Sequence, residues 1–278
     1  MECSYALFDT EGNQIPSEMV MEVGEKFEAI SKEAKKLRHK FKEDMSVLNA
    51  FSLVLDRRSD LRAVLQWYIC RMEGWFAADA VKISVRCHDE EDLVEGGHGL
   101  VINGYHPVIA SLAKGLDVRL NHRVARIIHK LNSVKVVMQD GRAFKSDAAV
   151  VTVPLGVLKA KLIKFEARLP AWKEAAITDL EFGNENKIAL FFDSVCWPDV
   201  DFLGVVAPTT YACSYFLNLH KATGHPVLVY MPAGSLAIDI EKSPDEAAVD
   251  FAMMQLRTIL PHVVEPVALV HISPYPYV

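Results

Sequence analysis

The sequence predicts a mixed α/β fold, of the α+β kind, built from two domains. Three observations predict this class. Helical periodicity dominates the first ninety residues, a tight meander of short apolar strands follows, and strands then alternate with helices to the end. The chain has 278 residues, of which 51% are hydrophobic, so it can build one large or two ordinary cores.

Residues 1–90 form the predicted helical part. A hairpin-like start at Tyr5–Phe8 leads to a helix that we expect Ser17 to cap. Further helices are predicted at Ser46–Leu55 and Ser59–Phe76, and a short strand at Val81–Arg86. The first helix has its apolar residues three and four positions apart, on one stripe: Val20, Val23, Phe27, Ile30, Ala34 and Leu37. Its basic face is predicted to be solvated.

Residues 91–160 are predicted to form a second part, with a helix, a strand, a three-stranded meander and a final apolar strand. Asp140-Gly141 marks a tight turn inside the meander, and Pro154 ends the last strand. The expected elements are a helix at His106–Lys114 and strands at Leu116–Leu120, Val124–His129, Val134–Met138, Ala143–Lys145 and Ala148–Val153.

Residues 161–278 are predicted to form a mixed sheet with helices. The last helix begins with Ser243-Pro244-Asp245-Glu246, which places proline at the first helical position and acids in the first turn. The expected helices are Ala171–Asp179 and Ser243–Leu260, and the expected strands are Lys187–Phe192, Leu203–Val206, Ala212–Leu217, Val227–Tyr230 and Ala268–Ile272.

Charge and cysteine usage exclude several classes of protein. The net charge of −6 and a pI near 5.9 argue against a nucleic-acid partner, which requires a basic surface. Five scattered cysteines without a CxxC pair indicate a reducing, intracellular compartment. No apolar run approaches the ~20 residues of a membrane span, so no membrane partner is predicted. The oligomeric state stays open.

Common catalytic motifs are missing from the sequence. No GxGxxG follows a strand, and Gly96-Gly97-His98-Gly99 lacks the spacing to hold a pyrophosphate. There is no P-loop, no GxSxG and no HExxH or comparable metal spacing. Residue patterns alone therefore indicate a mixed α/β intracellular protein without a metal site.

Four stretches, in this order along the chain, carry a more specific signal. They are Asn121–Val124, Val151–Lys159, Gly183–Lys187 followed by Cys196-Trp197-Pro198, and Tyr211–His220. Together they closely resemble the FAD-dependent amine oxidases, and within these the plant-type polyamine oxidases. The resemblance runs from about Cys3 to about Val267. It implies the two-domain flavin amine oxidase fold, in which residues 1–90 are a helical part of the substrate domain, residues 91–160 the remainder of the FAD-binding domain and residues 161–278 the substrate-binding domain with its mixed sheet. It also implies an FAD cofactor and a small polyamine substrate, spermine or spermidine.

The resemblance assigns a catalytic role to Lys187. This residue matches the family lysine that holds a water near flavin N5, where an ammonium stabilises charge as hydride arrives or positions oxygen for reoxidation of the flavin. Without the resemblance, Lys187 reads as a surface lysine at the edge of a strand.

Flavin contacts are implied at two places in the second part of the chain. Val124 matches a position whose backbone meets the adenine of FAD, although it also reads as a core valine. Pro154, Leu155 and Gly156 match the bend beside the flavin, where a glycine lets the backbone approach a flat ring. The alternative for Gly156 is a simple turn glycine.

Two acids and a tyrosine are the predicted substrate contacts. Glu73 approximately matches an acid that lines the polyamine tunnel of relatives, and its alternative is a solvated helix acid. Glu185 is predicted to be a second amine anchor, and its alternative is a polar residue of the turn with no contact to substrate. Tyr215 is predicted to wall an aromatic slot for the amine, or to be plain core. Phe192, Trp197 and Tyr211 are candidates for the same slot, with plain core as the more frequent alternative for each.

The chain departs from the family pattern at both ends. The GxGxxG βαβ unit that family members carry before Met1 is missing, and so is the C-terminal flavin segment expected after Pro266. We therefore expect weak retention of FAD. Two hypotheses stay open: a polyamine oxidase that releases hydrogen peroxide, and a catalytically inactive, FAD-free fragment that binds polyamines or a partner.

A third reading and the location complete the predictions. A histone-demethylase-like amine oxidase is disfavoured, because the sequence shows no inserted antiparallel helix pair. The resemblance implies a peroxisomal or cytoplasmic location, although the C-terminal Tyr275-Pro276-Tyr277-Val278 is not a peroxisomal signal of the SKL type.

Overall fold

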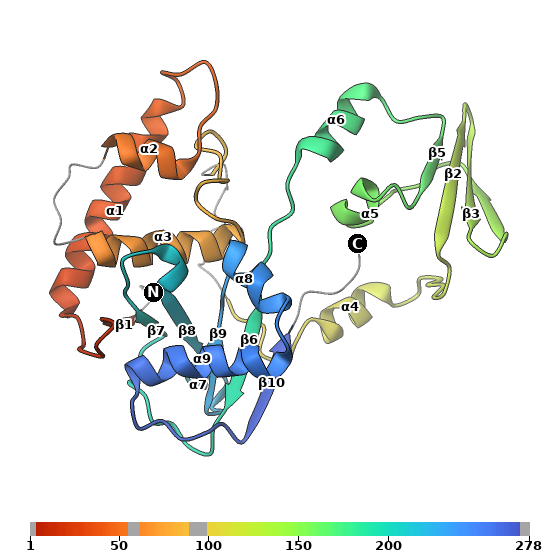
Figure 1. The fold of residues 1–278 in the computed structure, drawn as a ribbon. Helices are drawn as coiled ribbons and strands as arrows, with labels where there is room; N and C mark the ends of the chain where they lie inside the picture. Colours follow the sequence, from red (N-terminus) through yellow and green to blue (C-terminus); the bar gives the residue numbers. More distant parts are fainter. Residues whose placement is uncertain (1–3, 55–61, 89–98, 273–278) are drawn as a thin grey trace. The chain divides into compact units, whose positions relative to one another are not determined.

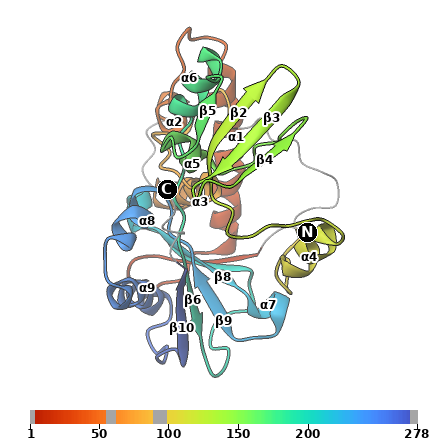
Figure 2. The ribbon, with the colours of Figure 1, turned by 90° about the vertical axis from the view of Figure 1, so that its right-hand side faces the viewer.

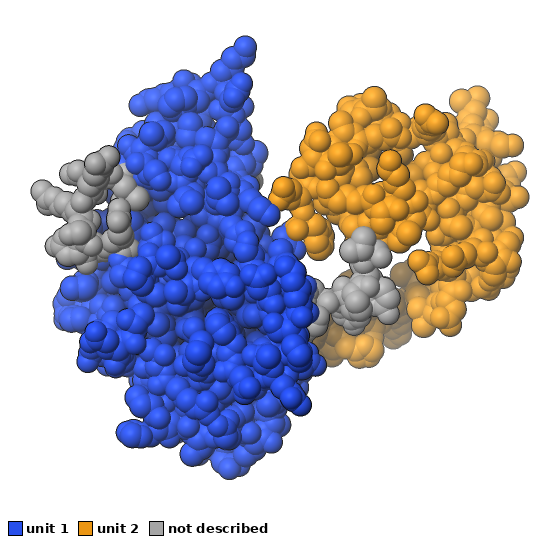
Figure 3. Space-filling model, viewed as in Figure 1, with its two compact units in different colours: residues 1–102, 183–274 blue, residues 103–182, 275–278 orange. Residues whose placement is uncertain are grey.

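The structure is a computed structural model that describes residues 4–54, 62–88 and 99–272. The chain divides into two compact units, which Figure 3 colours separately. Unit 1 comprises residues 1–102 and 183–274, and unit 2 comprises residues 103–182 with 275–278. Unit 1 is therefore discontinuous in sequence, and unit 2 is inserted between its two halves.

A six-stranded mixed sheet forms the centre of unit 1, in the order β1-β7-β8-β9-β6-β10 (Figure 1). β1 pairs with β7 in parallel, and the remaining neighbours are antiparallel. The strands are β1 (Tyr5–Phe8), β6 (Lys187–Phe191), β7 (Phe202–Val205), β8 (Ser214–Asn218), β9 (Val227–Tyr230) and β10 (Ala268–Ile272).

Helices cover both faces of this sheet. Successive strand residues point to opposite faces, so Phe216 packs in a core with α8 and α9, and Tyr215 packs in a core with α1, α2 and α3. The helices of unit 1 are α1 (Ser17–Leu37), α2 (Val47–Val54), α3 (Arg62–Phe76), α7 (His220–Thr223), α8 (Gly234–Glu241) and α9 (Asp245–Ile259), with a 3₁₀ turn, η1, at Thr210–Ala212.

Unit 2 is built around a smaller sheet, in the order β4-β3-β2-β5 (Figure 2). Its core has three buried residues, Ile127, Val134 and Ile163. The strands are β2 (Val124–Lys130), β3 (Ser133–Met138), β4 (Ala143–Ser146) and β5 (Lys164–Glu166), and the helices are α4 (His106–Ala113), α5 (Leu155–Lys159) and α6 (Ala171–Asp179). None of these three helices contains a buried residue.

The predicted fold class is confirmed. The meander appears as β2, β3 and β4, the mixed sheet of the last part is present, and Lys187 begins β6 as expected. The helix predicted at Ala171–Asp179 and the strands at Val227–Tyr230 and Ala268–Ile272 have the predicted bounds. The assignment of residues 1–90, 91–160 and 161–278 to functional domains stays a prediction.

Three predicted strands are wrong. Val81–Arg86 forms turns with one isolated bridge, Ser46↔Ser84. Some of its backbone groups bond to residues 45–47, but the N–H of Lys82 closes a turn on Asp79 instead of extending a ladder. Leu116–Leu120 and Ala148–Val153 contain the apolar residues of strands but join neither sheet of the described chain. A strand requires a partner for its backbone groups, and apolar composition does not supply one.

Some predicted helix ends also differ. Pro16, not Ser17, occupies the N-cap of α1, and no side chain caps it. Pro244, predicted as the first helical residue of α9, is its N-cap, so the helix begins at Asp245. The prediction missed α8, because Gly234 at its start reads as a turn residue. Residues 59–61 of the predicted third helix lie outside the described chain.

Candidate functional site

Lys187 and Glu185 form an ion pair at the start of β6. The Nζ of Lys187 lies 2.9 Å from Oε2 of Glu185, and the two side chains are 43% and 23% exposed. Residues i and i+2 of an extended chain share a face, so this arrangement places both charges on one side and turns Asn186 to the other. The ammonium thus has one carboxylate partner and stays accessible to solvent.

Asn186 fixes the segment that carries this pair. It is fully buried; its side-chain amide donates to the carbonyl of Ala237 (3.0 Å) and its backbone N–H to that of Pro232 (2.9 Å). These bonds attach the turn to the start of α8. The position of the Glu185–Lys187 pair is therefore set by the interior of unit 1.

Close backbone packing holds the other side of the same turn. The N–H of Asn184 donates to the carbonyl of Ala77 at 2.7 Å. A Cβ at Gly183 would lie 2.5 Å from that carbonyl oxygen, so the approach requires glycine here. The turn after α3 and the turn before β6 are thereby joined, although they are about a hundred residues apart in sequence.

Glu73 lies in the last turn of α3, beside this junction. Its Oε1 accepts the backbone N–H of Ala80 at 2.8 Å, and the Thr210 hydroxyl adds a second hydrogen bond. Burial raises the pKa of the Glu73 carboxyl above its ordinary 4.5, and the nearby Asp79 raises it further, while the two hydrogen bonds lower it. Glu73 is thus a half-buried carboxyl, which rules out the solvated helix acid.

Tyr215 lines the same cavity of unit 1 as Glu73. Its side chain is buried, and its hydroxyl packs so closely on Gly74 that a Cβ there would lie 1.9 Å from the oxygen. Burial is the main cause that raises the pKa of Tyr215, and the charge of Glu185 raises it further. Glu73 and Tyr215 line one cavity of unit 1, whereas Glu185 and Lys187 pair at the start of β6 and do not line that cavity.

Asp79 organises the third side of this region. Its carboxylate accepts the backbone N–H of Ser235 (2.9 Å) and the Ser235 hydroxyl (2.5 Å), at the start of α8. Gly234 has φ of +59°, and a Cβ there would lie 2.4 Å from the Asp79 carboxylate, so glycine serves both needs. No local pattern predicts this contact, because it joins residues 156 positions apart.

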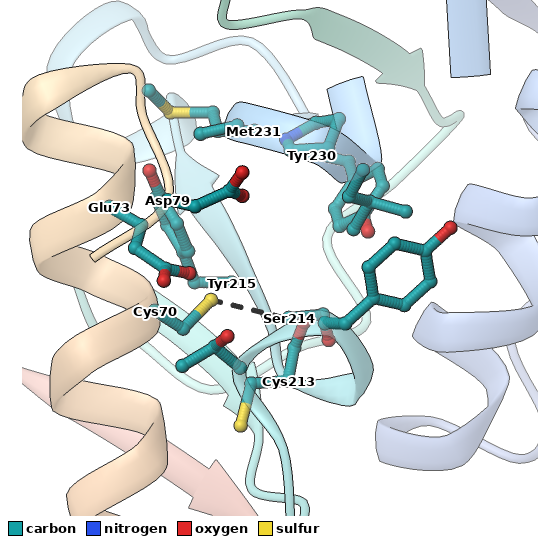
Figure 4. A pocket seen from close by; sticks show the side chains of 13 residues that line it. Cys70, Glu73, Asp79, Cys213, Ser214, Tyr215, Tyr230 and Met231 are labelled. Atoms are coloured by element: carbon teal, nitrogen blue, oxygen red, sulfur yellow. Dashed lines mark hydrogen bonds between the residues drawn. The ribbon is translucent and has the colours of Figure 1, made fainter. Parts of the chain in front are cut away.

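A small cavity lies between these elements (Figure 4). Its volume is about 30 Å³, which is room for one or two water molecules. Figure 4 shows Glu73 and Asp79 on the α3 side and Tyr230 and Ser214 across from them. The other lining residues are Cys70, Thr210, Tyr211, Cys213, Tyr215, Met231, Pro232, Ala233 and Leu236.

The predicted aromatic slot is only partly formed. Tyr211 and Tyr215 line the cavity, and the Tyr211 hydroxyl also donates to Asp239 at 3.0 Å. Phe192 and Trp197 instead pack edge to face, 5.4 Å apart, in the core beneath α8 and α9. Neither of these two residues lines the cavity, and their packing agrees with the alternative that they are plain core residues.

The predicted flavin contacts lie in unit 2. Val124 begins β2 next to an irregularity in its pairing with β3, and it packs on the same small core as Val153 and Val157. Pro154 is the N-cap of α5, which begins at Leu155. Gly156 is its second residue, and a Cβ there meets no atom within 4 Å. The structure thus places Val124 and the 154–156 segment around one core.

Metal-binding clusters and membrane-spanning helices are both absent from the described residues. Within residues 4–54, 62–88 and 99–272, no group of three or more histidine, cysteine or acidic side chains is placed to hold a metal ion. In the same ranges, no helix has the length and hydropathy needed to cross a membrane.

The sequence of the chain is similar to known proteins over most of its length. Residues 6–273 match the model of the flavin containing amine oxidoreductases. The chain is 59% identical over 270 residues to polyamine oxidase 2 of Arabidopsis thaliana, covering 95% of this chain and 55% of that protein. Polyamine oxidase 3 of Oryza sativa subsp. japonica is also 59% identical, with 95% and 56% covered. The chain thus spans about half the length of these relatives.

A solved structure has the same fold. A double mutant of putrescine oxidase, made to redesign cofactor binding, superimposes with a TM-score of 0.72 at 14% identity, over 98% of this chain and 67% of that one. Together with the family match over nearly all of the sequence, this likeness shows that the chain belongs to the flavin-containing amine oxidoreductase family and has its fold.

Proposed function

We propose that this chain is the amine-binding part of an FAD-dependent polyamine oxidase. The reaction would convert spermine or spermidine to an aminoaldehyde and a shorter amine, with release of hydrogen peroxide. The observation that carries the proposal is the high identity to plant polyamine oxidases over nearly all of the chain. The acids of the candidate site support it, because a polyamine is a flexible chain of cations.

The residues of unit 2 are compatible with a flat cofactor. The free space at Gly156 lets a ring approach the backbone, and Pro154 and Leu155 hold that backbone at the start of α5. Val124, with its backbone beside a pairing irregularity, would contact the adenine. FAD, when bound, would supply the acceptor for a hydride from the carbon next to the amine nitrogen.

Lys187 would act as the catalytic residue. Its ammonium donates one hydrogen bond to Glu185, so two N–H groups are left to hold a water molecule and to move a proton at Nζ. The hydrogen bond to the Glu185 carboxylate fixes the direction of this ammonium. The 43% exposed side chain leaves space for a water beside it.

Glu73 would be the stronger of the two amine anchors. The charge of Glu185 is already balanced by Lys187, whereas the bonds to Glu73 come from neutral donors. A substrate ammonium would compensate the cost of burying the Glu73 charge, which is the reason for its raised pKa. Tyr215, which lines the same cavity as Glu73, would wall the amine chain.

Retention of flavin tests the cofactor half of the proposal. The purified chain is incubated with excess FAD, free flavin is removed, and the visible spectrum is recorded; spermine is then added anaerobically. Bleaching of retained flavin supports the oxidase, and Lys187→Met should slow it while the matched variant Lys242→Met, at an exposed ion pair, should not. A colourless protein would favour the alternative, an FAD-free fragment.

Binding of spermine tests the recognition half without any cofactor. Calorimetric titration should show affinity that falls about tenfold or more in Glu73→Gln, which corresponds to loss of one charge-assisted interaction. Glu185→Gln should have the smaller effect, and Glu241→Gln, on the surface of α8, none. Equal affinity in all four proteins would contradict the role of Glu73.

A fluorescent fusion would test the expected peroxisomal or cytoplasmic location.

A further inference from the structure

Two buried hydroxyl groups of the cavity in unit 1 have no hydrogen-bond partner among the residues that the structure describes. They are Oγ of Ser214 and the phenolic oxygen of Tyr230, which are 2% and 1% exposed as residues. Figure 4 shows both side chains at the cavity, on the side away from Glu73 and Asp79. Buried hydroxyls without partners are rare in folded proteins, so this pair requires an explanation.

The surrounding contacts leave no protein group to satisfy them. Tyr230 is enclosed by Phe216, whose ring centre is 5.1 Å away, and by Phe251 at 6.2 Å. The carbonyl of Ser214 already accepts the indole N–H of Trp67 at 3.0 Å, but its hydroxyl has no bond. Because burial keeps the pKa of Tyr230 well above its ordinary 10, this phenol stays protonated and has a proton to donate.

The size and polarity of the cavity indicate its ligand. A water molecule occupies roughly 10–15 Å³ on the same measure, and requires two to four polar partners. The cavity offers about 30 Å³, the two hydroxyls and the carboxyl of Glu73. We propose that one or two internal water molecules bind in this cavity, bridging the Ser214 and Tyr230 hydroxyls toward the Glu73 side.

Such a water site would have a consequence for the buried acid. Water at the cavity side of Glu73 lets its carboxyl gain or lose a proton without opening α3. It also offers a donor to the carboxylate, or an acceptor to the protonated carboxyl. The inference concerns unit 1 alone and requires neither flavin nor substrate, so it holds or fails independently of the proposed oxidase activity.

Removal of each hydroxyl tests the proposal, because the direction of the change in melting temperature shows whether the hydroxyl has a partner. In Tyr230→Phe and Ser214→Ala, loss of a bond to water should lower the melting temperature by about 2–4 °C. If the hydroxyls have no partner at all, each substitution removes an unsatisfied buried group and raises the melting temperature, which would overturn the proposal. Tyr68→Phe is the matched control, because that hydroxyl donates to the carbonyl of Val20 at 3.0 Å and its loss must destabilise.

A second measurement separates water binding from general packing. Hydroxyls that share one water cluster should not behave independently, so the double variant should lose less than the sum of the two single shifts. A crystal structure should show water density within hydrogen-bond distance of both oxygens. A dry cavity in that structure would refute the proposal even if the single variants were destabilised.

Discussion

The two units differ in how much apolar surface they bury. Unit 1 has two large cores on opposite faces of a six-stranded sheet, with fully buried residues in every layer. Unit 2 has a core of three buried residues and exposes large apolar side chains along α4 and the segments after it, including Leu112 at 72%, Leu120 at 77% and Val150 at 89%. The substrate contacts predicted from sequence fall in unit 1, and the flavin contacts in unit 2.

The predicted amine contacts and the predicted flavin contacts are therefore held in place by different cores. Glu73, Tyr215, Glu185 and Lys187 are fixed by buried hydrogen bonds and close packing within their own unit. The Val124 and Gly156 region rests on a core too small to stabilise much by itself. Recognition of an amine should therefore tolerate stress that abolishes flavin contacts.

The largest effect is expected from truncating the core of unit 1. Leu203→Ala, at a residue that is 0% exposed, should lower the free energy of unfolding by about 2–5 kcal/mol, because it removes buried area and leaves a cavity. Chemical denaturation should show two transitions, with unit 2 unfolding first. Ile127→Ala should move only that first transition. A single transition shifted by both variants would break the distinction between the units.

A pair of glycines gives the next largest contrast. Gly74→Ala should destabilise unit 1 by about 1–3 kcal/mol, because the new methyl group would overlap the Tyr215 hydroxyl. Gly156→Ala in unit 2 meets nothing within 4 Å and should be neutral or slightly stabilising within a helix. Thermal melts of both variants measure this difference.

Two results would refine the comparison of these glycines. Adding Tyr215→Phe to Gly74→Ala should recover part of the loss, since the nearest atom would then be the ring carbon at 2.8 Å. No recovery would mean that helix α3 itself shifts. If Gly156→Ala leaves the stability unchanged but weakens flavin retention, the predicted flavin contact at Gly156 gains direct support.

A smaller, pH-dependent effect is expected from Glu73. Because burial raises its folded pKa, the native state holds this proton more tightly than the unfolded chain does, so the contribution to stability is fully present below about pH 4.5 and is lost as the pH rises through the folded pKa. Melting temperatures of Glu73→Gln and the original protein should agree at low pH and diverge above it, with the variant more stable. Parallel curves would show that the carboxyl is not buried.

The smallest effect is expected on the surface of unit 2. Val150→Ser and Leu120→Ser should change the free energy of unfolding by no more than about 0.5 kcal/mol, because both side chains are already exposed. The same variants should bind less of a dye that reports exposed apolar surface, and should aggregate less. A loss of stability comparable to that of Leu203→Ala would mean that these residues belong to a core.

Local pattern was sufficient to predict the elements whose partners lie nearby in sequence. The β2–β4 meander needs only short turns, and α9 shows its apolar stripe and its acidic first turn. Leu116–Leu120 and Ala148–Val153 have equally apolar sequences, yet whether a segment pairs depends on a neighbouring strand that its own residues do not encode.

The candidate site could be predicted only in part for the same reason. The ion pair between Glu185 and Lys187 follows from the two-residue repeat of a strand, and the sequence would have allowed that deduction. The burial of Glu73 could not be foreseen, because it depends on Ala80 folding back and on Thr210 from a distant segment. Asp79 accepts hydrogen bonds from Ser235 at the start of α8, and no local sequence pattern links these two distant turns.

The insertion of unit 2 within unit 1 sets an order of events during protein synthesis. Trp67 must wait for Ser214, 147 residues later, before its buried hydrogen bond can form. At about 5–20 residues per second, a ribosome needs roughly 7–30 s to make that interval. For this time α1, α2 and α3 lack the strands β7 and β8, and all of residues 103–182 are synthesised before those strands. A nascent chain paused in that window would present the apolar faces of three helices to chaperones.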